Sequence, residues 1–196
     1  MLLGSNNTMT YLSPSNWWAK IFRFIGKCQN LNYEDQYKYQ GVRLFDIRLY
    51  VSPRNKHIVA RNGKILYDLF SLFNVFSFFN KMGDVTVRVS LDITMEERMC
   101  NNDYDAIKTK FISTCNMLET VYPDIMYIGG YKTYDKSRLY TFKYEKEHGE
   151  PLIIDECNRK WYDWVFPFIV ARKNREMIER YENEHGFLLL NFVEKR

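Results

Sequence analysis

Hydrophobic and polar residues alternate along several short stretches of the chain, which is the pattern of β-strands whose successive side chains point to opposite faces. Eight such stretches are predicted to be strands: Leu2–Asn6, Val42–Val51, His57–Arg61, Val85–Thr94, Ile125–Tyr131, Leu139–Tyr144, Leu152–Asp155 and Phe187–Val193. Apolar residues at helical spacing predict helices between them: Asn16–Gly26, Tyr33–Gln40, Leu69–Met82, Asp103–Val121, and Trp161–Glu184 with an interruption at Pro167. The alternation of strands and helices predicts an α/β fold.

Single residues mark where several of these helices begin and end. Asn32 and Asp68 precede helical patterns and are expected to cap them, because their side chains accept hydrogen bonds from free backbone N–H groups. Gly41 and Gly83 stand where a helix commonly stops. The polar stretch Lys143–Glu150 is expected to be a solvated connection.

The chain of 196 residues is the size of one domain, and we expect residues 1–196 to share a single core. Eight strands in so short a chain predict a compact, distorted TIM-type (β/α) barrel whose crossover helices are shortened. The alternative is an open, mostly parallel sheet.

Composition excludes some functions and leaves others open. The net charge of +4 comes from 28 basic and 24 acidic residues without a long run of one sign, so no nucleic-acid partner is expected. The four cysteines form no CxxC pair, which indicates reduced thiols and no zinc or redox site. No cofactor is expected either.

The amino-terminal residues and the longest apolar runs bear on location. A strand pattern begins at Leu2, which leaves no room for a secretory leader, and no apolar run is long enough to span a bilayer. We therefore expect a cytoplasmic protein, with incorporation into a virion or an unusual export route as alternatives.

Charged side chains occupy one face of the second predicted strand. In RLFDIRL, Leu44, Asp46 and Arg48 share a face, opposite Phe45 and Ile47. The apolar face is expected to lie under helices, which turns Asp46 and Arg48 toward the interior. Burying the two charges costs several kcal/mol unless they pair or bind a ligand. They are therefore either a structural ion pair or part of a site.

The stretch TVRVSLDIT contains a second polar row, which consists of Arg88, Ser90, Asp92 and Thr94. In barrel enzymes the reacting groups lie at the carboxyl ends of the strands. We expect Asp46, Arg48 and Asp92 to converge at that end.

Three stretches in the first part of the chain occur together in a known family. They are GSNNTMTYL (Gly4–Leu12), KCQ (Lys27–Gln29) and EDQYKYQGVRLFDIRLYV (Glu34–Val51). In this order they resemble the phosphatidylinositol-specific phospholipase C family, which reads G-[TS]-H-[DN]-[ST]-M-T, a short CQ element, and Q-L-x-x-G-[VI]-R-x-[LF]-D-[IL]-R before a strand that ends in His-Gly. The resemblance is good to about Gly63, fair through Asp92 and covers roughly half of the chain.

The resemblance implies a distorted TIM-type barrel that cleaves phosphatidylinositol by attack of the inositol 2-hydroxyl on the phosphodiester. In that family one histidine accepts the proton of this hydroxyl and a second protonates the leaving oxygen. Asn6 stands at the position of the first histidine, Asn7 at the adjoining Asp/Asn, and Asn62 at the second histidine.

The resemblance also assigns the charged residues. Asp46 matches the family's acidic residue on the second strand, and Arg48 matches the arginine that stabilises phosphate charge in metal-independent members. Asp92 lies where the family has another polar charged group, and Asn191 matches loosely an aspartate that orients the first histidine.

Asparagine at both histidine positions removes the usual acid and base, because an amide does not titrate near neutral pH. Each proton-transfer group supplies about two to four powers of ten in rate. Arg48 can still bind two phosphate oxygens. His57, expected at the amino end of the barrel, and His148 and His185 are not expected to substitute.

Carboxylates leave two alternatives open. Asp92 or Asp155 is a candidate base if crowding raises its pKa. Asn7, Asp46 and Asp92 offer oxygen ligands to a hard cation, but Arg48 beside them would repel it, and no metal site is expected.

Further residues are candidates for contact with ligands or lipid. Lys132, in the stretch YIGGYKTY, and Asp155 are candidate ligand-binding residues with Asn7 and Arg48; a plain turn is the alternative for YIGGYKTY. Trp17 and Trp18 are candidates for peripheral membrane contact, and packing under a lid is the alternative.

Three functions follow from these patterns. The first is a phospholipase C-like barrel without its catalytic histidines that retains a pocket for a phosphate, an inositol phosphate or a phospholipid headgroup, or a structural role. The second is a divergent, active phosphodiesterase or cyclising lyase. The third is a scaffold component of a phage or another assembly with a protein partner.

Overall fold

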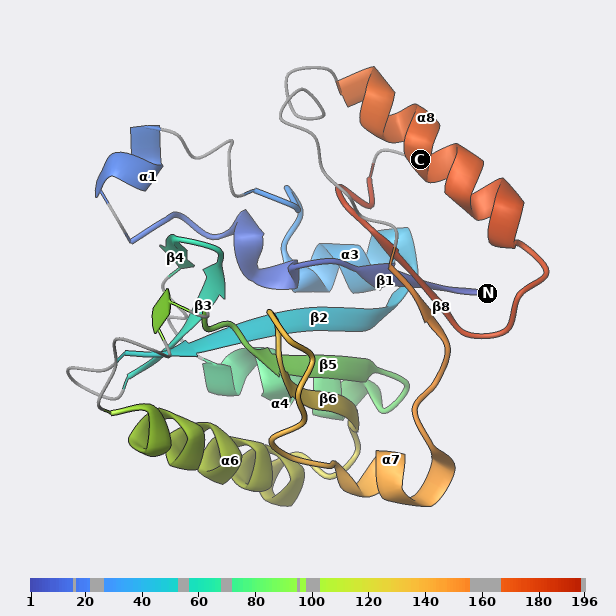
Figure 1. The fold of residues 1–196 in the computed structure, drawn as a ribbon. Helices are drawn as coiled ribbons and strands as arrows, with labels where there is room; N and C mark the ends of the chain where they lie inside the picture. Colours follow the sequence, from blue (N-terminus) through green and yellow to red (C-terminus); the bar gives the residue numbers. More distant parts are fainter. Residues whose placement is uncertain are drawn as a thin grey trace.

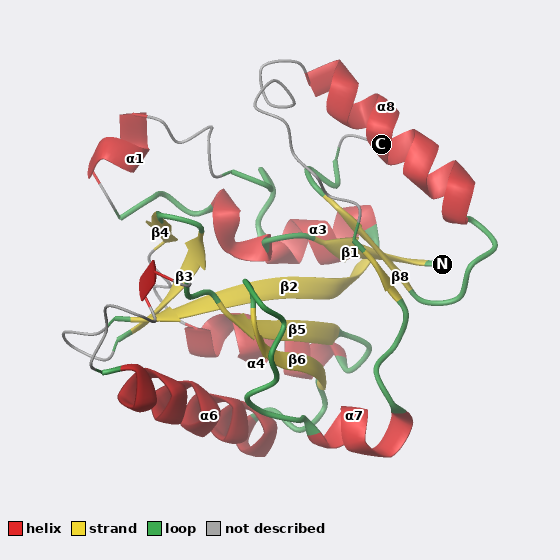
Figure 2. Cartoon of the chain, viewed as in Figure 1, coloured by secondary structure: helices red, strands yellow, loops and turns green. Residues whose placement is uncertain are grey.

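The computed structural model describes residues 1–15, 17–21, 27–52, 57–67, 72–94, 96–97, 103–155 and 167–194. These residues form a mixed α/β fold around one eight-stranded sheet (Figures 1 and 2). The strands are β1 Leu2–Ser5, β2 Val42–Val51, β3 Ile58–Asn62, β4 Ile65–Tyr67, β5 Thr86–Leu91, β6 Met126–Lys132, β7 Ile153–Ile154 and β8 Phe187–Leu190.

Six of the strands are parallel neighbours in the order β6-β5-β2-β1-β8-β7. Along the chain the parallel strands come in the order β1, β2, β5, β6, β7, β8. Each ladder joins two that follow one another in this chain order, or joins the last, β8, to the first, β1. In the described part of the chain, β6 and β7 are the consecutive pair without a ladder. The short hairpin β3–β4 extends antiparallel from the end of β2.

The described part of the chain forms six α-helices. They are α1 Trp17–Ile21, α3 Tyr33–Gln40, α4 Leu72–Met82, α6 Tyr104–Val121, α7 Lys143–His148 and α8 Pro167–Tyr181, with a 3₁₀ turn, η1, at Thr8–Tyr11. Apolar side chains of α4 and α6 pack against Phe45, Ile47 and Val89 of β2 and β5 in the main core. Phe45 stacks on Phe79 of α4 with ring centroids 4.4 Å apart. The odd-numbered residues of β2 therefore face helices, as the alternation predicts.

The opposite face contains a separate, smaller apolar cluster. Leu44 of β2, Ile128 of β6 and Phe187 and Leu189 of β8 pack together there, with Ile153 of β7 and Tyr144 of α7 against them. Leu189 packs closely against Gly4 of β1, where an added Cβ would lie 2.7 Å from the Leu189 side chain. This face thus brings together strands from both ends of the parallel order.

Side chains and a folded-back segment occupy the outer edge of β6. The Gly129 N–H donates to the Glu145 carboxylate at 3.1 Å, and the Gly129 carbonyl accepts from the Arg138 guanidinium at 3.0 Å. The Gly130 carbonyl accepts from the N–H groups of Leu139 and Tyr140 at 2.7 and 2.9 Å. Because these backbone groups are already bonded, they cannot form a ladder with β7.

The predicted caps and the helix and strand bounds agree with the structure in several places. The Asn32 side chain accepts from the Asp35 N–H at 2.9 Å, and Gly41 ends α3 with φ of 66°. Gly83, with φ of 74°, follows α4. Strand β2 and helix α3 have the predicted bounds. Asp68, predicted as a cap, lies outside the described residues, as do parts of the helices predicted at Asn16–Gly26 and Leu69–Met82.

Two predictions of secondary structure are wrong, and one short strand was missed. Leu139–Tyr144 is not a strand: residues 139–142 form no regular element, and α7 begins at Lys143, where a solvated connection was expected. The short strand β4 was not predicted, because ILY is too brief to show a period. Helix α8 starts at Pro167 in the described part of the chain, and residues 161–166 of the helix predicted at Trp161–Glu184 lie outside the described residues.

Candidate functional site

Polar residues gather at the carboxyl ends of the parallel strands. Asn6, Asp92, Asp155 and Asn191 directly follow β1, β5, β7 and β8, and Asp46 and Arg48 lie within β2. Carboxyl ends of parallel strands are where open sheets and barrels commonly place their sites.

Asp46 is the centre of this region. It is 1% exposed and forms ion pairs with Arg88 Nε at 2.7 Å and with Arg48 Nε at 3.2 Å. The backbone N–H of Asn7 donates to the same carboxylate at 3.2 Å. Arg88 also reaches Asp155 at 3.1 Å, which links β5 to the end of β7. We call Asp46, Arg48, Arg88 and Asp155 the charge cluster.

The charges of the cluster control its protonation. Burial alone would raise the pKa of Asp46, but the neighbouring Arg88 and Arg48 hold it well below its ordinary value. Burial opposes the charged guanidinium of Arg88, yet Asp46 raises its pKa, and the pKa of Arg48 is raised for the same reason. All three groups therefore stay charged, and Asp46 cannot serve as a base near neutral pH.

Asn6 lies beside Arg48 and Asn191. Its Oδ1 accepts from Arg48 Nη2 at 3.1 Å, and its Nδ2 donates to Asn191 Oδ1 at 3.0 Å. The amide therefore contacts both the arginine and the residue that the resemblance aligned loosely with an orienting aspartate.

Asn7 and Asn62 both contact Cys28. Their Nδ2 atoms lie 3.6 and 3.5 Å from its Sγ. Asn7 has φ of 47°, a left-handed conformation that asparagine tolerates better than most residues. Its Oδ1 is buried and accepts no hydrogen bond from the residues that the structure describes. The neighbouring Gln29 is fully buried and donates to the carbonyls of Asn6 and Leu190, which joins β1 to β8.

Asp92 stands at the side of the cluster nearest the β3–β4 hairpin. Its Oδ2 accepts from the Gly63 N–H at 3.2 Å and its Oδ1 from the Thr133 hydroxyl at 3.3 Å. Burial raises the pKa of Asp92, although the positive charges of Arg61 and Arg48 oppose the shift. Arg61 itself is paired with Glu97 at 2.8 Å.

A bulge in β6 decides which side chains of that strand reach the cluster. The register with β5 shifts between Val89 and Ser90, where Gly129 and Gly130 both have positive φ. Tyr131 is consequently buried within electrostatic reach of Arg88 and Asp46, and burial raises its pKa. The Lys132 ammonium instead binds Asp135 at 2.9 Å and Tyr134 at 3.3 Å. Lys132 is therefore not brought to Arg48, because the bulge exchanges the directions of the two side chains.

Four residues of this region were not named as site residues from the sequence: Arg88, Tyr131, Lys136 and Cys28. The alternating pattern predicts that Arg88 faces inward, but it does not reveal that Asp46 and Asp155 are its ion-pair partners. In the sequence, the two adjacent glycines of YIGGYKTY were the one sign of a bulge, because glycine readily adopts the positive φ that a bulge requires. The Lys136 ammonium lies 4.9 Å from the centre of the Tyr131 ring, and burial and the charges of Arg88 and Arg48 lower its pKa.

All three histidines are exposed to solvent. The expectation that His57 lies at the amino end is wrong, because β3 runs antiparallel to β2 and pairs Ile58 with Val51. His57 thus lies past the carboxyl end of β2. His148 stacks on Tyr144 at the end of α7.

The described parts of the chain contain surface hollows but no metal cluster and no membrane-spanning helix. No group of three or more His, Cys, Asp or Glu side chains there could hold a metal ion. No helix among the described residues has the length and apolar character that crossing a membrane requires. Two surface hollows of about 260 Å³ are lined by other residues than the charge cluster, one between α6, β6 and α7 and one beside Tyr50.

The chemical capacity of the arrangement lies in Arg48. Its side chain is 25% exposed, and its bonds to Asp46 and Asn6 use two of the five N–H donors of a guanidinium. The remaining donors can form a fork to an anion. The amide of Asn6 beside Arg48 cannot transfer a proton near neutral pH.

Comparison of the chain with protein families, with curated proteins and with solved structures finds no match.

Proposed function

We propose that this chain is a phospholipase C-like barrel protein that lacks the acid and base histidines and binds a phosphate-bearing ligand at Arg48. The observation that carries the proposal is the position of Arg48. Asp46 and Asn6 hold its guanidinium at the carboxyl end of the sheet, and a quarter of the side chain remains open.

Strand order and packing support a barrel. The parallel strands follow one another in chain order from β1 to β6 and return through β7 and β8 to β1. Leu44, Ile128 and Leu189 meet on the face opposite α4 and α6. The Arg88–Asp155 ion pair links β5 directly to the end of β7. In this proposal, side chains rather than a ladder close the barrel between β6 and β7.

The two residues that bond to Arg48, Asn6 and Asp46, cannot transfer a proton near neutral pH, which supports binding without turnover. Asn6 contributes an amide, Asp46 is held ionised by two arginines, and the three imidazoles are exposed elsewhere. Without a general acid and base, a rate contribution of about two to four powers of ten for each group is lost.

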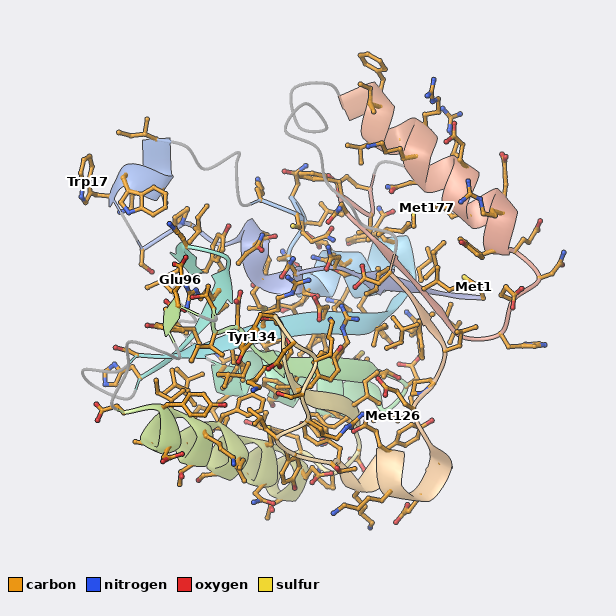
Figure 3. All side chains as sticks on the ribbon, viewed as in Figure 1. Met1, Trp17, Glu96, Met126, Tyr134 and Met177 are labelled. Carbon is orange, nitrogen blue, oxygen red and sulfur yellow. The ribbon has the colours of Figure 1, made fainter. Side chains whose placement is uncertain are left out.

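Contact with a lipid surface is part of the proposal. Helix α1 exposes 76% of Trp17 and 65% of Ile21, and Trp17 projects outward in Figure 3. Exposed indoles favour the membrane interface. Co-sedimentation with phosphatidylinositol vesicles should fall when Trp17 is changed to Ser, and unchanged co-sedimentation would contradict this contact.

The binding proposal is tested by calorimetric titration with myo-inositol 1-phosphate. Arg48→Met should weaken binding about tenfold or more, because a hydrogen bond to a charged group is lost. Arg172→Met is the matched control, since Arg172 is 75% exposed on α8, and it should leave affinity unchanged. No binding by the folded wild type, or equal losses in both variants, would refute the proposal.

A second candidate function follows from Asp92. Its raised pKa is the property of a general base, and an active phosphodiesterase would use it with Arg48. Formation of cyclic inositol phosphate that disappears in both Asp92→Asn and Arg48→Met would establish this alternative. Formation no faster than in buffer supports binding without turnover.

A further inference from the structure

The turn after β6 folds back over the sheet and carries a lysine toward the charge cluster. The Lys136 N–H bonds to the Lys132 carbonyl at 3.0 Å, and the Lys132 N–H bonds to the Ser137 carbonyl at 3.0 Å. Tyr131 and Arg138 pair as an isolated antiparallel bridge. Lys136 has φ of 55°, so the chain reverses tightly at this residue.

Tyr131 fixes the direction of the Lys136 side chain. The Lys136 ammonium lies 4.9 Å from the centre of the Tyr131 ring, a cation–π contact. Tyr131 is 8% exposed, and the strand register places it beside Ser90 of β5, which lies beside Arg48 of β2. The ammonium of Lys136, an exposed residue, therefore lies over the Tyr131 ring, whereas the Lys132 ammonium is paired with Asp135.

The balance of charge differs between the two sides of the site. On the β6 side, Arg48, Arg88 and Lys136 face two carboxylates, Asp46 and Asp155. On the side of the β3–β4 hairpin, Arg61 faces two carboxylates, Asp92 and Glu97. An anion is accordingly attracted to the β6 side, between Arg48 and Lys136.

We propose that Lys136 and Arg48 form a two-cation clamp that selects phosphate monoesters over phosphodiesters. This inference rests on the proposed anion site at Arg48. A monoester dianion presents three terminal oxygens, so one can bind the guanidinium while another binds the ammonium. A diester has two terminal oxygens that share one negative charge, and each cation interacts with it more weakly.

The clamp predicts a binding preference that depends on Lys136. Methyl phosphate and dimethyl phosphate are suitable probes because they differ by one methyl group. Near about pH 8 the monoester is a dianion. By NMR titration, the wild type should bind methyl phosphate about tenfold more tightly than dimethyl phosphate, and Lys136→Gln should reduce this ratio to about threefold or less.

Two further variants identify the role of charge at this position. Lys136→Arg should keep the preference, since it retains the cation. Lys143→Gln removes a lysine that is 80% exposed on α7 and should leave both affinities unchanged. Circular dichroism of each variant confirms that it is folded.

The outcomes separate this inference from the proposed function. If neither ester binds the folded wild type, the anion site itself is wrong. If both esters bind equally, or if Lys136→Gln keeps the wild-type preference, the clamp is wrong while the anion site stands. A lost preference in Lys136→Gln that Lys136→Arg restores supports the clamp.

Discussion

Asp46 carries a buried negative charge on which two arginines depend. Changing Asp46 to Asn removes the charge and turns an amide N–H toward guanidinium donors, which leaves Arg88 buried without its closest counter-charge. Breaking a buried pair from one side costs about 3–5 kcal/mol, so we expect this loss in the free energy of unfolding measured in urea.

Glu34→Gln is the control for this measurement. It removes an exposed ion pair with Lys38 on α3, which is worth at most about 1 kcal/mol. Similar losses in the two variants would mean that the charge cluster does not contribute to stability.

The pH dependence of stability should reveal the same carboxylate. The folded-state pKa of Asp46 is lowered from its ordinary value of 3.8, so its stabilising contribution is present above that pH and is lost as the pH falls below it. Asp92 acts in the opposite sense, because its raised pKa makes the ionised form costly and acidification relieves that cost. Between about pH 5 and pH 2, Asp46→Asn should lose less stability than the wild type, and Asp92→Asn should lose more. Parallel pH profiles for all three proteins would contradict the assigned shifts.

Alternation along β2 was enough to predict that Asp46 and Arg48 lie together, because both residues belong to a regular strand. The same rule fails in β6. Gly129 and Gly130 insert a bulge, so Tyr131 faces the cluster and Lys132 does not. A period of two residues carries no information about a local shift of register, and Lys136 is reached only through the turn that follows.

At the scale of elements, this bulge depends on glycine. In Gly130→Ala the new Cβ would lie 2.2 Å from the Tyr140 carbonyl oxygen, at a φ of 69°. The clash and the left-handed strain together should cost about 3 kcal/mol or more in unfolding free energy. Because Tyr131 follows the bulge directly, anion affinity should fall as well.

Gly41 offers a matched control, because it has a φ of 66° and a Cβ added there would meet nothing within 4 Å. Gly41→Ala should show the left-handed strain alone, about 1–2 kcal/mol, with unchanged anion binding. Equal costs at the two glycines would show that the close approach of Tyr140 is not essential to the bulge.

Local signals set some elements and long-range contacts set others. Asn32 and Gly41 bracket α3, and both act through bonds to neighbouring residues, so the sequence reveals its bounds. Residues 139–144 have an alternating pattern but do not form a strand. There, Leu139 and Tyr140 bond to Gly130 and Glu145 reaches back to Gly129, contacts that no local pattern contains.

At the scale of the whole molecule, Glu145 satisfies a backbone N–H at the edge of β6 that a neighbouring strand would otherwise bind. Its side chain is 3% exposed, accepts from the Gly129 N–H and pairs with Arg138 at 2.9 Å. The strand pattern of the sequence predicts a barrel of neighbouring strands. The missing ladder between β6 and β7 arises because backbone groups at this edge of β6 are bonded to side chains. Glu145 belongs to α7, a stretch that was predicted to be a solvated connection, so its burial against β6 could not be predicted from the sequence.

Two carboxylates that share Arg138 allow the importance of this edge to be measured. Glu145→Ala would leave the Gly129 N–H without an acceptor and Arg138 without its buried partner, so unfolding free energy should fall by about 3 kcal/mol. Glu150→Ala removes the other partner, which is 47% exposed, and should cost less than about 1 kcal/mol. Hydrogen exchange at Gly129 should accelerate only in Glu145→Ala. If Glu150→Ala were as damaging, the exposed end of the ion-pair network would secure the edge, and the interval between β6 and β7 would need another explanation.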